Sequence, residues 1–250
     1  MVLILWHNLY GAAVTFHEQT RIRLRRSAER IRRSCVALCG IVLLCSMLYA
    51  AADSGTITFS LDFPNSSPEH YDILVQPDGH AHYDSSGKIS QDSDVRDEYQ
   101  IDFTFTDSTR ARIFGLAAQA HHFSGKVDSG NKKLAFTGTK KLVYKDGDKT
   151  SSAEYNYSQQ PAIQQLTSLF QNVAATLEYG RRLTYFHRYQ KLALDDELKR
   201  MEDQAKRGGL AELQVLSAVL QAIYEDTSVI NVVRARARRI AEMKPVALGK

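Results

Sequence analysis

Residues 71–84 read YDILVQPDGHAHYD and predict two β-strands joined by a tight turn. Apolar side chains recur at every second position over residues 71–75 and again over 80–83, which is the period of a strand with one buried face. Between them stands Pro77-Asp78-Gly79, in which proline fixes φ, aspartate bonds to nearby backbone and glycine accepts a positive φ. The stretch therefore predicts a β-hairpin whose register is set by its turn.

Similar patterns lie on both sides of this hairpin. Over residues 107–120 the apolar period changes to three and four, which predicts a helix with Asp107 or Ser108 as its N-cap. A second hairpin is expected across Asp146-Gly147, because Asp-Gly is a strong turn signal. The further strands predicted from alternation cover residues 56–61, 99–105, 134–144 and 151–157.

After Tyr157 the apolar residues recur at helical spacing to the end of the chain. Pro161 suits the first turn of a helix, and Gly180 is expected to end that helix. A second helix is predicted with Leu192 among its apolar residues. The three helices that follow the first cover residues 185–206, 210–224 and 228–243.

The order of these elements predicts an α+β protein in three parts, because a run of strands is followed by a run of helices. Residues 1–52 form a targeting leader. Residues 53–180 form an α+β domain, with a small antiparallel sheet and two packed helices. Residues 181–250 form a C-terminal helical subdomain.

Residues 34–52 (SCVALCGIVLLCSMLYAAA) carry no charge and follow an arginine-rich stretch. At a helical rise of about 1.5 Å, a segment of this length spans roughly 28 Å, close to the thickness of a bilayer core. Its apolar centre and its small residues up to Ala52 also suit a signal peptide cleaved before Asp53. A cleaved signal and a retained anchor both stay open. Either one places the body outside the cytoplasm, because the arginines stay inside.

The positive charge of the chain belongs to this leader. The whole chain carries a net charge of +4, and the leader holds seven arginines and two glutamates, which is +5 and leaves −1 for the other 198 residues. Nucleic-acid binding usually depends on clustered positive charge, so no nucleic-acid partner is expected. Cys35, Cys39 and Cys45 also lie in the leader, so the body can form no disulfide, thiolate metal site or cysteine nucleophile.

His80 and His82 are the candidate metal ligands. At positions i and i+2 of a strand, their side chains share one face about 7 Å apart. Zinc needs three or four ligands, so further groups would have to come from elsewhere in the fold. The alternative is that both imidazoles simply lie on the open face of the hairpin. No nucleophile-elbow, phosphate-loop or zinc-protease motif occurs in the chain, and no cofactor is expected.

Arg234 and Arg238 stand one helical turn apart near the C-terminus. They are candidates for a patch that binds an anion or a partner protein. The alternative is a charged outer face near the end of a helix, where positive charge is favourable.

The chain resembles a family of uncharacterised exported bacterial domains in its order of strands, Asp-Gly turns and helices. The resemblance rests on YDILVQPDGHAHYDSSGK (residues 71–88), TRARIFGLAAQAHHFSG (109–125) and KKLVYKDGDKTSSAEYNY (140–157), and it covers about residues 55–178. It implies a small sheet covered by two helices, with unknown function. It implies no catalytic residue.

The sequence therefore predicts an exported protein of unknown biochemical activity, expected to be a non-enzymatic binding or structural module of the cell envelope. Its location would be periplasmic or extracellular, or anchored in the inner membrane through residues 34–52 if these are not cleaved. A cell-envelope protein is the expected kind of partner. The alternative function is an exported metal-assisted hydrolase that uses His80 and His82.

Overall fold

The computed structural model describes residues 55–64, 66–88 and 96–243. The predicted leader over residues 1–52, with its expected cleavage site at Ala52 and Asp53, lies outside these residues. Within the described ranges, no helix is both long and apolar enough to cross a membrane.

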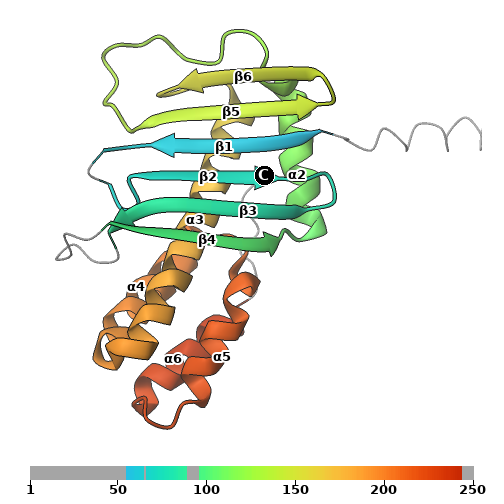
Figure 1. Cartoon of the computed structure of the whole chain (residues 1–250). Helices are drawn as coiled ribbons and strands as arrows, with labels where there is room; N and C mark the ends of the chain where they lie inside the picture. The colour runs from blue at the N-terminus through green and yellow to red at the C-terminus, as the bar shows by residue number, and fades with distance from the viewer. Residues whose placement is uncertain (1–54, 65, 89–95, 244–250) are drawn as a thin grey trace, which may run out of the picture. The chain divides into compact units, whose positions relative to one another are not determined.

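The strands of the described chain form an antiparallel sheet in the order β4-β3-β2-β1-β5-β6 (Figure 1). The first four strands follow each other along the chain, and the β5–β6 hairpin returns to pair with β1 on its other side. This sheet, together with the helices, confirms the predicted α+β class. The strands are β1 (Thr56–Asp62), β2 (His70–Val75), β3 (His80–Lys88), β4 (Arg96–Thr104), β5 (Thr139–Asp146) and β6 (Lys149–Tyr155).

The β2–β3 turn forms as predicted. Gly79 has a φ of +92°, and its N–H donates to Gln76 O at 3.0 Å, while Asp78 Oδ1 accepts from His80 N at 3.0 Å. The carbonyl of Pro77 accepts from Arg110 Nη1 at 3.0 Å, which fixes the turn to the following helix. The second predicted turn also forms, with Gly147 at a φ of +55°.

One face of the sheet is buried under α2 (Asp107–Gln119) and α3 (Pro161–Tyr189), which both lie behind the strands in Figure 1. Phe59 of β1 stacks on Phe170 of α3, with ring centroids 5.1 Å apart. The N-cap of α2 is Thr106, not the predicted Asp107 or Ser108, because the Thr106 hydroxyl accepts from Thr109 N.

Helix α3 is continuous, so the predicted helix end at Gly180 is wrong. A methyl group at position 180 would lie 2.5 Å from Leu216 Cδ2, so this glycine permits close packing inside the helix. The buried apolar residues of α3 up to Leu177 belong to one apolar core, and those from Tyr179 onward belong to a second. One core lies between the sheet and the helices, and the other lies among the C-terminal helices. The predicted boundary between residues 180 and 181 thus falls inside the helix that both cores share.

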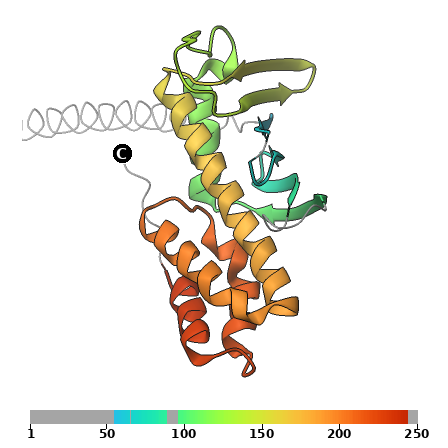
Figure 2. The same ribbon diagram turned by 90° about the vertical axis from the view of Figure 1, so that its left-hand side faces the viewer.

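The C-terminal half of α3 packs against α4 and α5, and α6 in turn packs against α4 and α5 (Figure 2). The predicted helix over residues 185–206 is wrong at its start, because α3 ends at Tyr189 and a short turn precedes α4. Leu192 lies in that turn with 89% of its surface exposed, so it is not part of an apolar face. The bounds are α4 (Leu194–Lys206), α5 (Ser217–Glu225) and α6 (Asn231–Ala241), with short 3₁₀ turns at Lys191–Ala193 and Leu213–Leu216.

Glu212 connects these C-terminal helices to the start of α2. Its carboxylate accepts from Thr106 N at 2.9 Å, from Thr106 Oγ1 at 3.0 Å and from Thr109 Oγ1 at 2.5 Å. The carboxylate therefore satisfies backbone and hydroxyl donors at a helix N-terminus, where negative charge is favourable.

Candidate functional site

His80 and His82 both lie on the open face of the sheet, opposite the buried Ala81 and Tyr83. His82 Nδ1 donates to Asp102 Oδ1 on the neighbouring strand β4 at 2.7 Å. His80 Nδ1 and Thr104 Oγ1, also across β3 and β4, are hydrogen-bonded at 3.2 Å. The two predicted metal ligands, His80 and His82, are thus hydrogen-bonded to two different residues of β4.

The structure adds one nearby carboxylate to the two histidines but no complete ligand set. A cavity of about 340 Å³ lies beside them, lined also by Asp102 and Thr104. Over the described ranges, no three or more His, Cys, Asp or Glu side chains gather closely enough to hold a metal ion. A metal site on His80 and His82 therefore stays a prediction.

A third histidine on the open face, His70, lies between two carboxylates. Its Nδ1 donates to Asp62 Oδ1 at 2.6 Å and its Nε2 donates to Asp72 Oδ2 at 2.9 Å. Partial burial alone would lower the pKa of His70, but the two hydrogen-bonded carboxylates outweigh it and raise the pKa above 6.5. The pair of acceptors therefore favours the imidazolium form.

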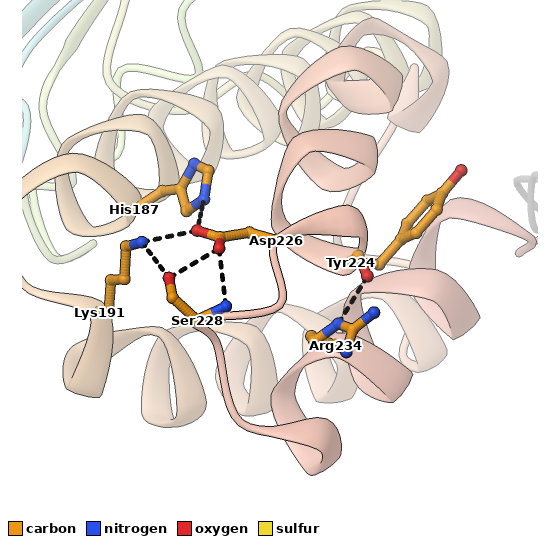
Figure 3. A network of polar contacts seen from close by, with 6 residues as sticks. All are labelled: His187, Lys191, Tyr224, Asp226, Ser228 and Arg234. Carbon is orange, nitrogen blue, oxygen red and sulfur yellow. Dashed lines mark hydrogen bonds and ion pairs between the residues drawn. The ribbon is translucent and has the colours of Figure 1, made fainter.

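Arg234 and Arg238, the predicted anion patch, both have protein partners. Arg234 Nε donates to the carbonyl of Tyr224 at the end of α5, at 2.8 Å (Figure 3). Arg238 pairs with Glu242 one turn further along, at 2.9 Å. An anion would have to compete with these partners, and the patch stays a prediction.

Beside Arg234, a polar cluster joins the end of α3 to the loop between α5 and α6 (Figure 3). Asp226 accepts from Lys191 Nζ at 2.6 Å, from His187 Nε2 at 2.9 Å and from the backbone and hydroxyl of Ser228. These donors, with Lys191 first, hold the pKa of Asp226 well below its usual range. Because the groups of the cluster bond to each other, we assign it a structural role: it holds the loop between α5 and α6 against the end of α3.

A second polar cluster lies between the sheet and α3. Tyr83 Oη and Ser85 Oγ of β3 donate to Glu178 Oε1 at 2.9 and 2.8 Å, and Arg181 Nε lies 3.4 Å from Glu178 Oε2. Burial and the Glu178 carboxylate raise the pKa of Tyr83 well above its usual value. The cluster borders a cavity of about 330 Å³. Its hydrogen bonds converge on one carboxylate oxygen, and they fix α3 to β3.

A cavity of about 590 Å³ lies between the end of β6 and the first half of α3. We call it the Lys140 groove. This volume is in the range of small-molecule sites. Its lining comes from Thr137 and Lys140, from residues 155–158, and from Ile163, Gln164, Thr167, Ser168 and Gln171 of α3.

Lys140 shapes this groove from an inward position on β5. It is 4% exposed, and its Nζ donates to Thr137 O, Thr137 Oγ1, Gly138 O and Asn156 O at 3.0–3.1 Å. Burial lowers the pKa of Lys140, and its four acceptors are all neutral oxygens. Since an ammonium group has three protons, these are already engaged, and Lys140 holds the loop before β5 against the end of β6.

The groove is a site that the sequence analysis missed. Its two walls come from segments separated by the β5–β6 hairpin, so no short motif contains it. One signal was available: in the alternation that buries Leu142 and Tyr144, position 140 also points inward, and a lysine at an inward position calls for an unusual environment.

Comparison with known proteins gives this chain no family. No family model matches it, and no curated protein sequence matches it. The resemblance to exported bacterial domains of unknown function therefore stays a prediction.

Proposed function

We propose that this chain is a non-enzymatic binding module of the cell envelope that holds its ligand in the Lys140 groove. The observation that supports this most is the composition of the groove. Among the described residues that line it, Lys140 alone is charged, and its ammonium group is occupied by protein oxygens. Such a lining can bind and orient a ligand, but it offers no free acid and base for proton transfer.

The placement in the cell envelope rests on the predicted leader, with its arginines and the uncharged segment over residues 34–52. It is tested by cell fractionation and by sequencing the N-terminus of the mature protein. Asp53 at the N-terminus of a periplasmic species supports cleavage and export. An intact leader on a cytoplasmic protein contradicts the proposal.

Binding in the groove is tested with the isotope-labelled protein and a low-molecular-weight fraction of cell-envelope extract. We expect amide shifts over residues 156–171 in the NMR spectrum. Ser168→Trp should abolish them, because Ser168 is exposed and lines the groove, so an indole there fills the site without entering the core. Shifts that persist in Ser168→Trp, or no shifts in the native protein, contradict a binding site in the groove.

The alternative function, a metal-assisted hydrolase, is supported by the His82–Asp102 contact, because a carboxylate bonded to an imidazole is common in metal sites. Metal analysis of the purified protein separates the two functions. Stoichiometric zinc that is lost in His80→Ala and in His82→Ala would favour the hydrolase over the binding module.

A further inference from the structure

We infer that the ligand of the Lys140 groove is a neutral saccharide of at least two sugar rings. This inference rests on the proposed function, and it names the class of ligand for the same site. It is carried by the charge of the lining, by the spacing of its polar groups and by an exposed aromatic ring.

The lining favours a ligand without charge. No carboxylate is present among the described residues that line the groove, and the ammonium of Lys140 has four oxygen acceptors within 3.1 Å. A cationic ligand would lose hydration here without gaining an opposite charge, and an anionic ligand would find every N–H of Lys140 already donated to a protein oxygen. A ligand whose polar groups are neutral meets no such penalty.

Three polar side chains of α3 face the groove in a row. Gln164, Ser168 and Gln171 occur at i, i+4 and i+7, which places them on one face of the helix. Seven residues at about 1.5 Å each give a row about 10 Å long, which is comparable to two linked sugar rings. The groove thus offers polar groups along the length of a disaccharide.

These groups have hydrogen-bonding capacity left for a ligand. Gln164 Nε2 donates to Tyr157 Oη at 2.8 Å and to Ser158 O at 2.9 Å. These two bonds fix the orientation of the amide, and they leave its carbonyl oxygen Oε1 as an acceptor for a ligand. Neither Ser168 nor Gln171 hydrogen-bonds through its side chain to another described residue. Hydroxyl and amide groups supply both donors and acceptors, as the hydroxyl groups of a sugar require.

Tyr157 supplies an aromatic surface at the rim. The residue is 42% exposed, and its hydroxyl accepts a hydrogen bond from Gln164 Nε2. Sugar rings carry C–H groups on their faces, and such faces pack well against an aromatic ring. A ring that is both exposed and fixed in orientation binds at a lower cost in conformational entropy than a mobile one.

A peptide fits the same groove less well. Extended peptides usually bind by adding a strand to a free sheet edge. The backbone beside the groove is already paired, because Asn156 N donates to Asp128 Oδ2 at 2.9 Å and Tyr157 O accepts from Ser129 N at 2.8 Å. Side-chain groups therefore have to carry the recognition.

The test is an NMR titration of the full chain with four probes at up to 10 mM. Two probes are neutral sugars, N,N′-diacetylchitobiose and maltotriose; the others are a neutral blocked tripeptide and a disaccharide that contains glucuronic acid. We expect at least one neutral sugar to shift amides over residues 156–171, and the other two probes to bind at least tenfold more weakly. Equal or tighter binding of the peptide or of the acidic sugar overturns the inference.

Variants test the two parts of the site separately. We expect Tyr157→Ala to weaken sugar binding at least tenfold. Tyr157→Phe should weaken it less than about threefold, because the ring stays and the lost hydroxyl is bonded to Gln164. Gln171→Ala should weaken binding about three- to tenfold, in line with the loss of one neutral hydrogen bond to the ligand. The matched control is Tyr189→Ala, because Tyr189 is 61% exposed at the other end of α3 and should leave the affinity unchanged.

The outcome also separates this inference from the proposed function. Shifts of groove amides with envelope extract, but with neither neutral sugar, would keep the binding module and reject the saccharide. No shifts with extract or with sugar would reject both.

Discussion

Gly180 and Gly115 allow the same substitution to be made in two helices with opposite expected results. A methyl group at Gly180 of α3 would lie 2.5 Å from the buried Leu216 Cδ2, whereas one at Gly115 of α2 would meet, within 4 Å, no described atom beyond its chain neighbours and the backbone of its own helix. Gly115 is exposed on its helix and Gly180 is buried. The perturbation is Gly→Ala at each position.

The magnitudes follow from two effects. Replacing glycine by alanine inside a helix is worth about 1 kcal/mol of stability from backbone propensity. Forcing an extra methyl group into a packed core costs about 1–3 kcal/mol. Gly115→Ala should therefore stabilise the protein by about 1 kcal/mol. Gly180→Ala should destabilise it by about 1 kcal/mol, because the cost of overpacking Leu216 exceeds the gain in propensity.

Urea unfolding followed by circular dichroism measures both free energies. Leu216→Ala supplies the internal control: on its own it should cost about 2–5 kcal/mol, and it should cost less when residue 180 is already alanine, because the added methyl group then has room. If Gly180→Ala stabilises the protein as much as Gly115→Ala, then the close contact between α3 and Leu216 does not exist and the reasoning fails.

Three further predictions concern polar contacts. Glu212→Ala should destabilise the protein by about 1–2 kcal/mol and speed amide exchange in the first turn of α2, because the N-cap residue Thr106 loses the acceptor of its N–H and of its hydroxyl; unchanged exchange would contradict this role. His70→Gln should be less stable than the native protein at low pH only. The raised pKa of His70 gives a contribution that is complete below about pH 6.5 and is lost as the pH rises through the folded-state pKa, so the two unfolding free energies should converge in alkaline buffer. Glu178→Ala should cost about 3–5 kcal/mol in the unfolding free energy, because it removes a buried carboxylate from two hydroxyl donors and from Arg181; a loss below about 1 kcal/mol would show that the cluster adds little.

The strands could be predicted from sequence because their signals are local. Ile57 and Phe59 alternate with polar residues, and both are fully buried in the structure. The Asp-Gly pairs at Gly79 and Gly147 both turn out to have positive φ, which is the property that selected glycine. The apolar period of a strand and the residues of a tight turn both depend on residues adjacent in the chain, so the sequence alone is enough to predict them.

Helix ends were predicted less well because they depend on distant residues. A glycine such as Gly180 is typical of a helix end. Here, however, it lies inside α3, where the absence of a side chain leaves room for Leu216, a residue far along the chain. Leu192 fits an apolar pattern by spacing, yet it lies in a turn and is exposed. In both cases tertiary packing, and not the local sequence pattern, determined where the helix begins or ends.

The candidate site could not be predicted because it is assembled across the fold. Gln164 and Gln171 read as ordinary polar positions on an amphipathic helix, and Tyr157 reads as the end of a strand. Their shared role depends on Lys140, which draws the loop at Thr137 toward the end of β6. His80 and His82, by contrast, were prominent in the sequence because they are close together, and they lie on the open face with separate partners.

Helix α3 has a consequence for how the two apolar cores depend on each other. It has 29 residues, so at about 1.5 Å per residue it is about 43 Å long, and each core covers one part of it. If either core melted alone, half of this helix would lose its apolar neighbours, so the two cores should unfold as one cooperative unit. A ligand in the Lys140 groove would then also slow local opening at Asp226, because linkage through a shared helix protects residues that the ligand never touches.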